Sequence, residues 1–166
     1  MVREDQNAFL SREYTEAIRY MDNARETLQK AKKDDDGYYA DKKYVRAACG
    51  TAYSGVLVAL DAWLETKGVL NSKKNGRKSV DFYKRSISAL DKKMATYFVT
   101  VYDALHLFGY YDGQQKVNII QAGFEDAYKI IDKIKPENPV EVKASRGDGL
   151  KRWLNMLLIS AAVMFK

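Results

Sequence analysis

Cysteine and histidine each occur once in this sequence of 166 residues, as Cys49 and His106. One cysteine excludes an intramolecular disulfide and a cysteine-cluster metal site. One histidine excludes a histidine-rich metal site and a zinc-binding pair of histidines on one helix. The sequence also lacks a glycine-rich phosphate loop that ends in Gly-Lys-Ser/Thr. We therefore expect neither a metal ion nor a cofactor.

Proline is nearly as scarce, because Pro136 and Pro139 are the only two in the sequence. An interior proline costs a helix about 3 kcal/mol, so the long proline-free stretch before them favours uninterrupted helices. The length is typical of one domain. We expect a helical bundle over residues 1–136, followed over residues 137–166 by a linker and an apolar helix that packs on the bundle or on a partner chain.

Apolar residues recur at spacings of three and four, which is the signature of amphipathic helices. Ser11, Asp41 and Ser79 are suitable N-caps, and Gly68 suits a left-handed helix end. Asp91 marks a kink or a new start. The pattern predicts an all-α, up-and-down four-helix bundle, with helices over residues 10–33, 41–68, 79–108 and 115–135.

The predicted core comprises the inward-facing residues of these helices, among them Val45, Ala52, Leu60, Phe98 and Phe108. Residues 47–55 of the second helix are mostly alanine, glycine, serine and threonine. Small side chains let another helix approach closely, although each helical glycine costs about 1 kcal/mol. We expect the tightest contact of the bundle, or a dimer interface, at this run.

The tail is more apolar than the rest of the chain, and residues 150–165 predict a short fifth helix that must be buried. Its longest apolar stretch is shorter than the about 20 residues needed to cross a membrane, so we expect no membrane span. Residues 1–7 are charged and do not resemble a secretory signal. A cytoplasmic protein that forms homodimers is the resulting expectation.

His106 is the strongest single candidate for acid–base chemistry, because imidazole titrates near neutral pH. In an α-helix Tyr102 and Asp103 lie four and three residues before it, and Tyr110 four after it, so all three share its face. A histidine with a purely structural hydrogen bond inside the bundle is the alternative interpretation.

Tyrosine is abundant, with twelve residues in the chain. Several gather at expected helix ends, where they either fill the rim of the bundle or form platforms on which bases stack. This group comprises Tyr38, Tyr39, Tyr44, Tyr53, Tyr110 and Tyr111.

The net charge is +6, and residues 38–78 carry eight basic and three acidic side chains. The basic patch is formed by Lys73, Lys74, Arg77 and Lys78 in one loop. Such a loop either contacts the phosphates of a nucleic acid or is simply a solvated surface. Nucleic acid is therefore a candidate partner.

Two segments resemble HEPN-domain proteins. The first is residues 44–64, rich in alanine and tyrosine, followed by Lys67-Gly68-Val69. The second is the turn Gly109-Tyr110-Tyr111-Asp112 with the helix over residues 124–134. The resemblance covers residues 10–135 and implies a four- or five-helix bundle that commonly dimerises.

Many HEPN members are ribonucleases with an Arg-(four to six residues)-His motif, and others without it act as binding modules. Residues 99–101, which stand five to seven positions before His106, are Val, Thr and Val, so the motif's arginine is absent. The resemblance therefore favours a non-enzymatic member, with Tyr53, Tyr110, Tyr111, Asp112 and Arg46 as candidates for ligand binding.

Two main hypotheses follow, beside a third option, a small-ligand binder with a tyrosine-lined cleft. The first is a self-associating, non-enzymatic binding protein with a protein partner, RNA or a nucleotide as ligand. The second is a divergent HEPN-type ribonuclease centred on His106, assisted by Asp103, Tyr102 or a distal arginine such as Arg46.

Overall fold

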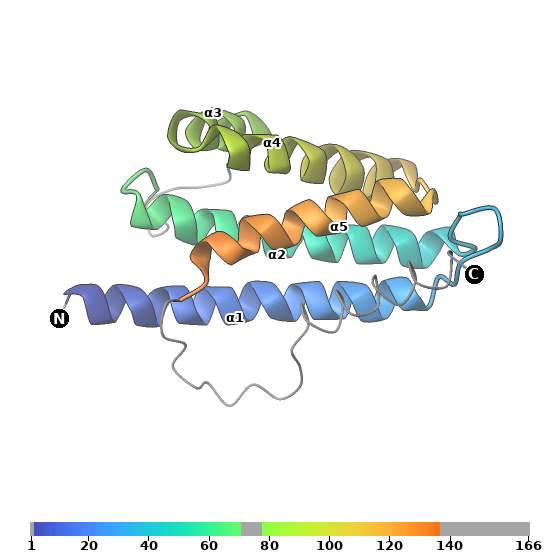
Figure 1. Ribbon diagram of the computed structural model, residues 1–166, viewed down its shortest axis with the longest axis horizontal. Helices are drawn as coiled ribbons and strands as arrows, with labels where there is room; N and C mark the ends of the chain where they lie inside the picture. Colours follow the sequence, from blue (N-terminus) through green and yellow to red (C-terminus); the bar gives the residue numbers. More distant parts are fainter. Residues whose placement is uncertain (1, 71–77, 137–166) are drawn as a thin grey trace, which may run out of the picture.

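The chain forms an all-α bundle in the computed structural model, which describes residues 2–70 and 78–136 (Figure 1). The fifth helix expected over residues 150–165 lies outside these residues. The described elements are the α-helices α1 (Val2–Gln29), α2 (Lys42–Thr66), α3 (Val80–Leu90), α4 (Lys92–Val101) and α5 (Val117–Ile131), the π-helix η1 (Tyr102–Asp112) and the 3₁₀-helix η2 (Asp132–Ile134).

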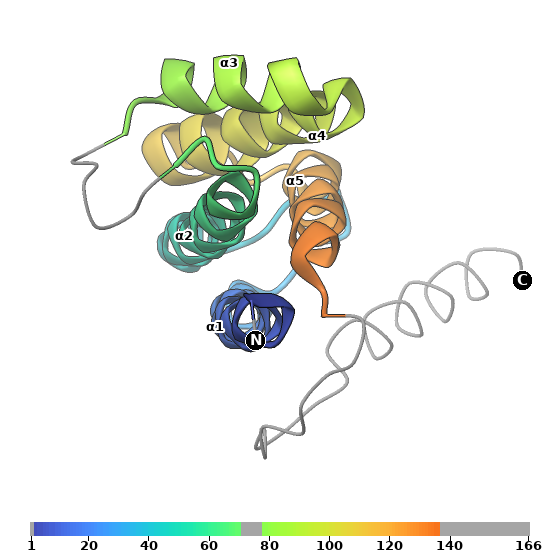
Figure 2. The ribbon, with the colours of Figure 1, turned by 90° about the vertical axis from the view of Figure 1, so that its left-hand side faces the viewer.

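Four long helical segments, α1, α2, α4 with η1, and α5, alternate in direction, as the predicted up-and-down bundle requires. Helix α1 runs from left to right in Figure 1, α2 returns, α4 and η1 run together to the right, and α5 returns. Viewed along the bundle in Figure 2, α2 and α5 lie between α1 below and α4 above, and α3 crosses on top. The central position of α2 explains why it contributes the largest share of the buried residues.

Side chains at the predicted caps hold several helix starts in place. The Asp41 carboxylate accepts a hydrogen bond from the Lys43 amide at 2.9 Å, and the Ser79 hydroxyl accepts one from the Phe82 amide at 3.2 Å. Asp91 separates α3 from α4 and accepts a bond from the Met94 amide at 2.9 Å. Gly68 has φ +70°, the left-handed conformation expected after a helix.

Helix α1 differs from its prediction at both ends. It begins at Val2, so Ser11 is not an N-cap but a buried residue within the helix, and its carbonyl accepts a hydrogen bond from the Thr15 hydroxyl. It ends at Gln29 because the chain turns at Lys32, which has φ +51°. The N-cap rule failed here because the polar residues before Ser11 are themselves compatible with a helix.

The helix predicted over residues 79–108 also differs, because it is divided at Asp91 and continues past residue 108 as a π-helix, so residues 109–112 are helical and not a turn. Eleven residues, Tyr102–Asp112, have π-helical rather than α-helical hydrogen bonding. The i→i+5 pattern shifts which side chains share a face, and Phe108, predicted to be in the core, is 43% exposed. The other core residues predicted by name above are buried.

The small-residue run of α2 makes its tight contacts inside the bundle. A Cβ atom added to Gly55 would lie 2.7 Å from the Tyr20 Cβ and 3.1 Å from the Ala17 carbonyl oxygen, both on α1. Buried Gly109 of η1 packs against Cys49 on another side of α2. The run therefore serves helix packing within one chain.

We predict that Gly55→Ala destabilises the fold by about 1–3 kcal/mol, because the added methyl group forces α1 away from α2. The free energy of unfolding is measured by urea denaturation followed by circular dichroism. Ser54→Ala, at an exposed neighbour on the same helix, is the matched control and is expected to change stability by at most about 0.5 kcal/mol. Equal stability of the two variants would contradict the close approach.

Candidate functional site

The clearest candidate site is a cluster of five rings where η1 lies beside α2. One ring comes from α2 and four come from η1. We call this cluster the aromatic face, and it consists of Tyr53, Tyr102, His106, Tyr110 and Tyr111.

His106 is the centre of the aromatic face. Its imidazole stacks on the Tyr53 ring, with 4.4 Å between ring centroids and 27° between the planes. The Tyr102 centroid lies 5.3 Å away, and the Tyr111 ring meets the imidazole edge-on at 5.1 Å. The side chain is half-buried, and this burial lowers the pKa of His106 below its usual 6.5. The neutral imidazole is therefore favoured near pH 7.

The π-helix brings Tyr111 to the face of η1 that carries His106. In a helix with i→i+5 hydrogen bonds, the residue five positions later comes close to the same face. Tyr111 is five residues after His106 and contacts it, while Tyr110, four residues after it, stacks at 6.1 Å with a plane angle of 17°. π-helical segments are frequently found at functional sites.

Gly50 makes room for the outer part of the aromatic face. A Cβ atom added to Gly50 would lie 3.0 Å from the Tyr110 ring, so the ring lies directly on α2 where a side chain is missing. Gly50 is three residues before Tyr53, and the two therefore face η1 together.

The aromatic face has a buried part and an exposed part. Tyr53 is half-buried, and burial raises the pKa of its phenol to about 12. Tyr110 and Tyr111 are 46% and 60% exposed, and their rings meet edge-on at 5.2 Å. The exposed pair offers planar apolar surface to a ligand, whereas the Tyr53 ring packs against His106 from α2.

Cations lie at both ends of the aromatic face. The Arg46 guanidinium donates a hydrogen bond to the Tyr111 carbonyl at 2.7 Å. At the other end, the Lys84 ammonium of α3 lies 4.8 Å from the centre of the Tyr102 ring, within the range of a cation–π contact. The sequence offered no signal for Lys84, because α3 comes close only through tertiary packing.

The two acidic candidates, Asp103 and Asp112, are not part of the aromatic face. Asp103 is half-buried in the first turn of η1, and Asp112 is exposed at its end. None of the hydrogen bonds or ion pairs within residues 2–70 and 78–136 joins His106 to a carboxylate, which is the partner that a catalytic histidine commonly has.

Of the predicted basic patch, only Lys78 lies within the described residues. The Lys78 ammonium forms an ion pair of 2.5 Å with Asp61, which also accepts a hydrogen bond of 2.7 Å from the Tyr83 hydroxyl. Lys78 therefore anchors the start of α3 to α2. Lys73, Lys74 and Arg77 lie outside the described residues.

Other kinds of site find little support in residues 2–70 and 78–136. That part of the chain contains no group of three or more His, Cys, Asp or Glu that could hold a metal ion. Cys49 is fully buried, and burial raises the pKa of its thiol to about 12, which suppresses the reactive thiolate. Among the described residues, α2 is the one helix with the length and composition of a membrane span, and 56% of its most apolar window is buried in the bundle.

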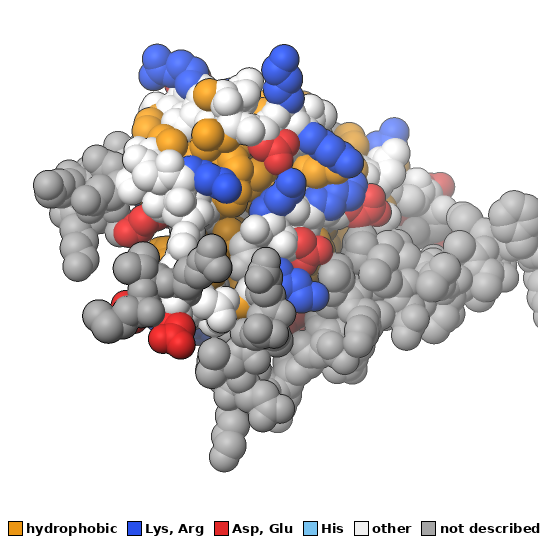
Figure 3. All heavy atoms as spheres, turned by 60° about the vertical axis from the view of Figure 1, so that its left-hand side comes forward, with side chains coloured by type: hydrophobic (Ala, Val, Ile, Leu, Met, Phe, Trp, Pro, Cys, Tyr) orange, Lys and Arg blue, Asp and Glu red, His pale blue; other side chains and the backbone are white. Residues whose placement is uncertain are grey.

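A second apolar area occurs at the opposite end of the bundle. Figure 3 shows apolar side chains there among lysines, arginines and acidic residues. Leu90, the last residue of α3, and Val69, which follows the end of α2, are both exposed. The ring contacts of α3 and α4, Phe82 with Tyr83 and Tyr83 with Phe98, involve buried or half-buried rings, so we consider this area the weaker candidate.

Comparison with known proteins places the chain in a family. The profile of a domain of unknown function, DUF5618, matches residues 12–136, and the chain belongs to this family. A solved structure of a protein of unknown function from Dyadobacter fermentans is 39% identical. The match covers 75% of this chain and 94% of the other, with a TM-score of 0.64. No curated protein matches the chain.

These comparisons support the helical fold and leave the function open. Neither match points to HEPN domains specifically. The candidate residues above therefore rest on the geometry of this chain alone.

We predict that His106 makes stability depend on pH between about pH 7 and pH 5. Its pKa is lowered in the folded chain, so the unfolded chain binds the proton more readily and stability falls as the pH drops below about 6.5. His106→Gln removes this contribution. Urea midpoints of both proteins at pH 7 and pH 5 are the measurement, and an equal loss in the two proteins would show that His106 is not buried as described.

Proposed function

We propose that this protein is a non-enzymatic binding protein whose aromatic face binds the bases of RNA or of a nucleotide. The observation that carries the proposal is the exposed pair of rings, Tyr110 and Tyr111, held on the His106 and Tyr53 stack. Stacking of a base on an aromatic side chain contributes about 1–3 kcal/mol per base and is tolerant of sequence. Two adjacent exposed rings are enough for one or two bases.

The charges around the rings suit the same class of ligand. Arg46 and Lys84 lie at opposite ends of the aromatic face, and cations beside stacking rings are typical of surfaces that bind single-stranded nucleic acid. The chain as a whole has a net charge of +6, which favours encounters with polyanions.

Binding is a better interpretation of His106 than catalysis. Its ring is stacked between Tyr53 and Tyr110, and burial lowers its pKa. A stacked, neutral imidazole adds planar surface and a hydrogen-bonding nitrogen to a binding site.

The second candidate function is a HEPN-type ribonuclease. One observation favours it: Arg46 bonds the Tyr111 carbonyl, and the Tyr111 ring contacts His106, so a distal arginine and the histidine share one surface. The expected Arg-x4-6-His spacing is still absent. HEPN membership itself is part of this second proposal.

Self-association stays a proposal, and the glycines of α2 no longer support it. The glycines of α2 that predicted a dimer interface are occupied by Tyr20 and Tyr110 of the same chain. A monomeric mass in gel filtration with light scattering would exclude the homodimer. A protein partner likewise stays a prediction from the sequence.

We predict that the double variant Tyr110→Ala/Tyr111→Ala binds a fluorescein-labelled RNA octamer at least about tenfold more weakly than the wild type, since one stacking contact contributes about 1–3 kcal/mol. Fluorescence anisotropy at fixed salt is the measurement. Tyr97→Ala is the matched control, because Tyr97 is a half-buried tyrosine with two lysines beside it, Lys93 and Lys129, outside the aromatic face. Equal binding by the wild type and the double variant would exclude the aromatic face as the binding site.

We also predict that the purified protein leaves a mixed RNA pool intact over hours at pH 7, as judged on a denaturing gel. Cleavage by the wild type that is lost in a folded His106→Ala variant would replace the binding proposal with the ribonuclease. Cleavage that persists in His106→Ala would indicate a contaminating nuclease.

A further inference from the structure

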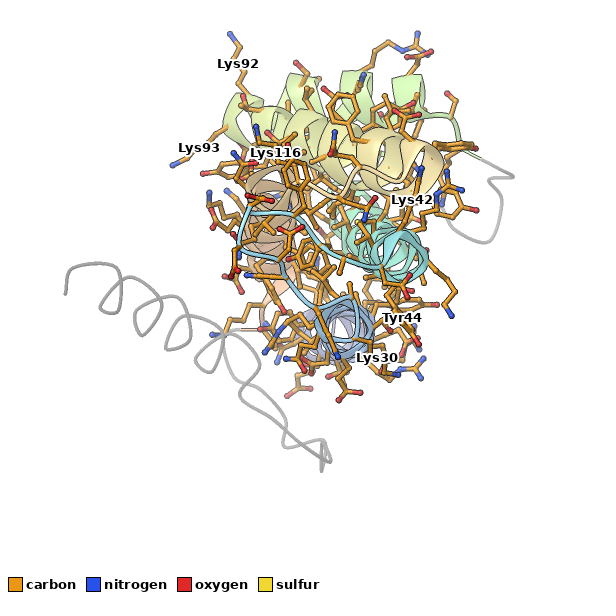
Figure 4. All side chains as sticks on the ribbon, turned by 90° about the vertical axis from the view of Figure 1, so that its right-hand side faces the viewer. Lys30, Lys42, Tyr44, Lys92, Lys93 and Lys116 are labelled. Atoms are coloured by element: carbon orange, nitrogen blue, oxygen red, sulfur yellow. The ribbon has the colours of Figure 1, made fainter. Side chains whose placement is uncertain are left out.

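One stripe of α2 runs along the aromatic face and continues past its end. Lys42, Arg46, Gly50 and Tyr53 are spaced by four, four and three residues, so they lie on one side of the helix. The Tyr53 ring stacks on His106, and the Tyr110 ring lies against Gly50. Lys42 and Arg46 extend this stripe toward the end of the bundle viewed in Figure 4, where Lys42 is labelled beside α2.

Both cations lie over Gly113, the residue that ends η1. A Cβ atom added to Gly113 would lie 2.8 Å from the Lys42 Cγ and 2.7 Å from the Arg46 Nε, so the two side chains occupy the space above the glycine. Gly113 has φ +67°, a conformation that L residues other than glycine rarely adopt. The missing side chain therefore leaves room for both positive side chains at the end of η1.

Part of this arrangement has a structural explanation. Cations near the C-terminal end of a helix interact favourably with its free carbonyl groups, and Arg46 donates to the Tyr111 carbonyl at 2.7 Å. A guanidinium has five N–H donors, so this one bond leaves most of its capacity unused. Lys42 has no such role in the described hydrogen bonds, and its side chain is exposed.

The pair also lacks a neutralising partner within the part of the chain that the structure describes. None of the ion pairs there includes Lys42 or Arg46. Like charges four residues apart on a helix repel each other, and an anion bound between them removes that repulsion. Two carboxylates lie nearby along the chain: Asp41 directly precedes Lys42 and caps α2 by accepting a hydrogen bond from the Lys43 amide, and exposed Asp112 directly precedes Gly113.

We propose that Lys42 and Arg46, held over Gly113, bind the phosphate group of a ligand whose base stacks on Tyr110 and Tyr111. This inference rests on the proposed function and names its ligand more closely: a nucleoside phosphate, either free or as a residue of a single RNA strand. Arg46 supplies directional hydrogen bonds and Lys42 a compact charge, which is the usual division between these residues in phosphate sites.

The decisive comparison is between AMP and adenosine, titrated separately into the wild-type protein by isothermal calorimetry. We expect AMP to bind at least about tenfold more tightly, which is the effect of one charge-assisted contact. The affinity for AMP should fall as salt is raised from low to physiological concentration, whereas the affinity for adenosine should stay constant.

Lys42→Gln is the test variant, because its side chain can be changed without removing the Arg46 bond to η1. We expect it to lower the affinity for AMP toward that for adenosine and to leave adenosine binding unchanged. Lys43→Gln is the matched control, since Lys43 is the next residue, is exposed, and places its ammonium over the Tyr44 ring at 4.7 Å instead. It should bind AMP like the wild type.

The outcomes separate the two proposals. Equal affinity for AMP and adenosine, with no effect of Lys42→Gln, would overturn the phosphate site while the aromatic face still binds bases. Binding of neither compound, nor of an RNA octamer, would overturn both proposals. If the octamer displaces AMP at far lower concentration than AMP itself binds, the phosphate site serves an RNA strand. Equal concentrations would instead support a free nucleotide as the ligand.

Discussion

The missing side chains of α2 set the distance at which its neighbours pack. Gly55 brings the backbone of α1 close, and Gly50 lets the Tyr110 ring of η1 lie directly on the helix. Gly109 of η1, which also lacks a side chain, packs directly against Cys49 of α2. Because α2 is the central rod of the bundle, these contacts fix the positions of α1 and η1 together. The aromatic face exists only at that separation, since rings on two helices stack only when the helices are close.

The π-helix adds a second constraint, because it determines which residues of η1 turn toward α2. Its hydrogen-bonding pattern places Tyr111 against His106 and leaves Phe108 exposed. An α-helix over the same residues would favour a different set. The wider turn thus leaves two aromatic residues of η1, Phe108 and Tyr111, on the surface.

Charge is arranged around this surface in a way that burial alone does not require. The centre is neutral near pH 7, because burial lowers the pKa of His106, while Arg46 and Lys84 place positive charge at the two ends. Lys42 extends the charge beyond Gly113. A planar, anionic ligand matches this distribution better than a neutral or cationic one. This match is the physical link between the proposed base-binding surface and the proposed phosphate site.

The sequence by itself determined the helical class, most core residues and the boundaries at Asp41, Ser79 and Asp91, because periodicity and capping are properties of neighbours along the chain. It also placed His106 and Tyr110 on one helix face and pointed to Tyr53, Tyr111 and Arg46 as further candidates. Only the tertiary structure decided that these five side chains form one surface. Their contacts depend on the rotation and separation of two helices about fifty residues apart in sequence. That geometry is set by packing against glycines and by the π-helix, neither of which leaves a periodic signal in the sequence.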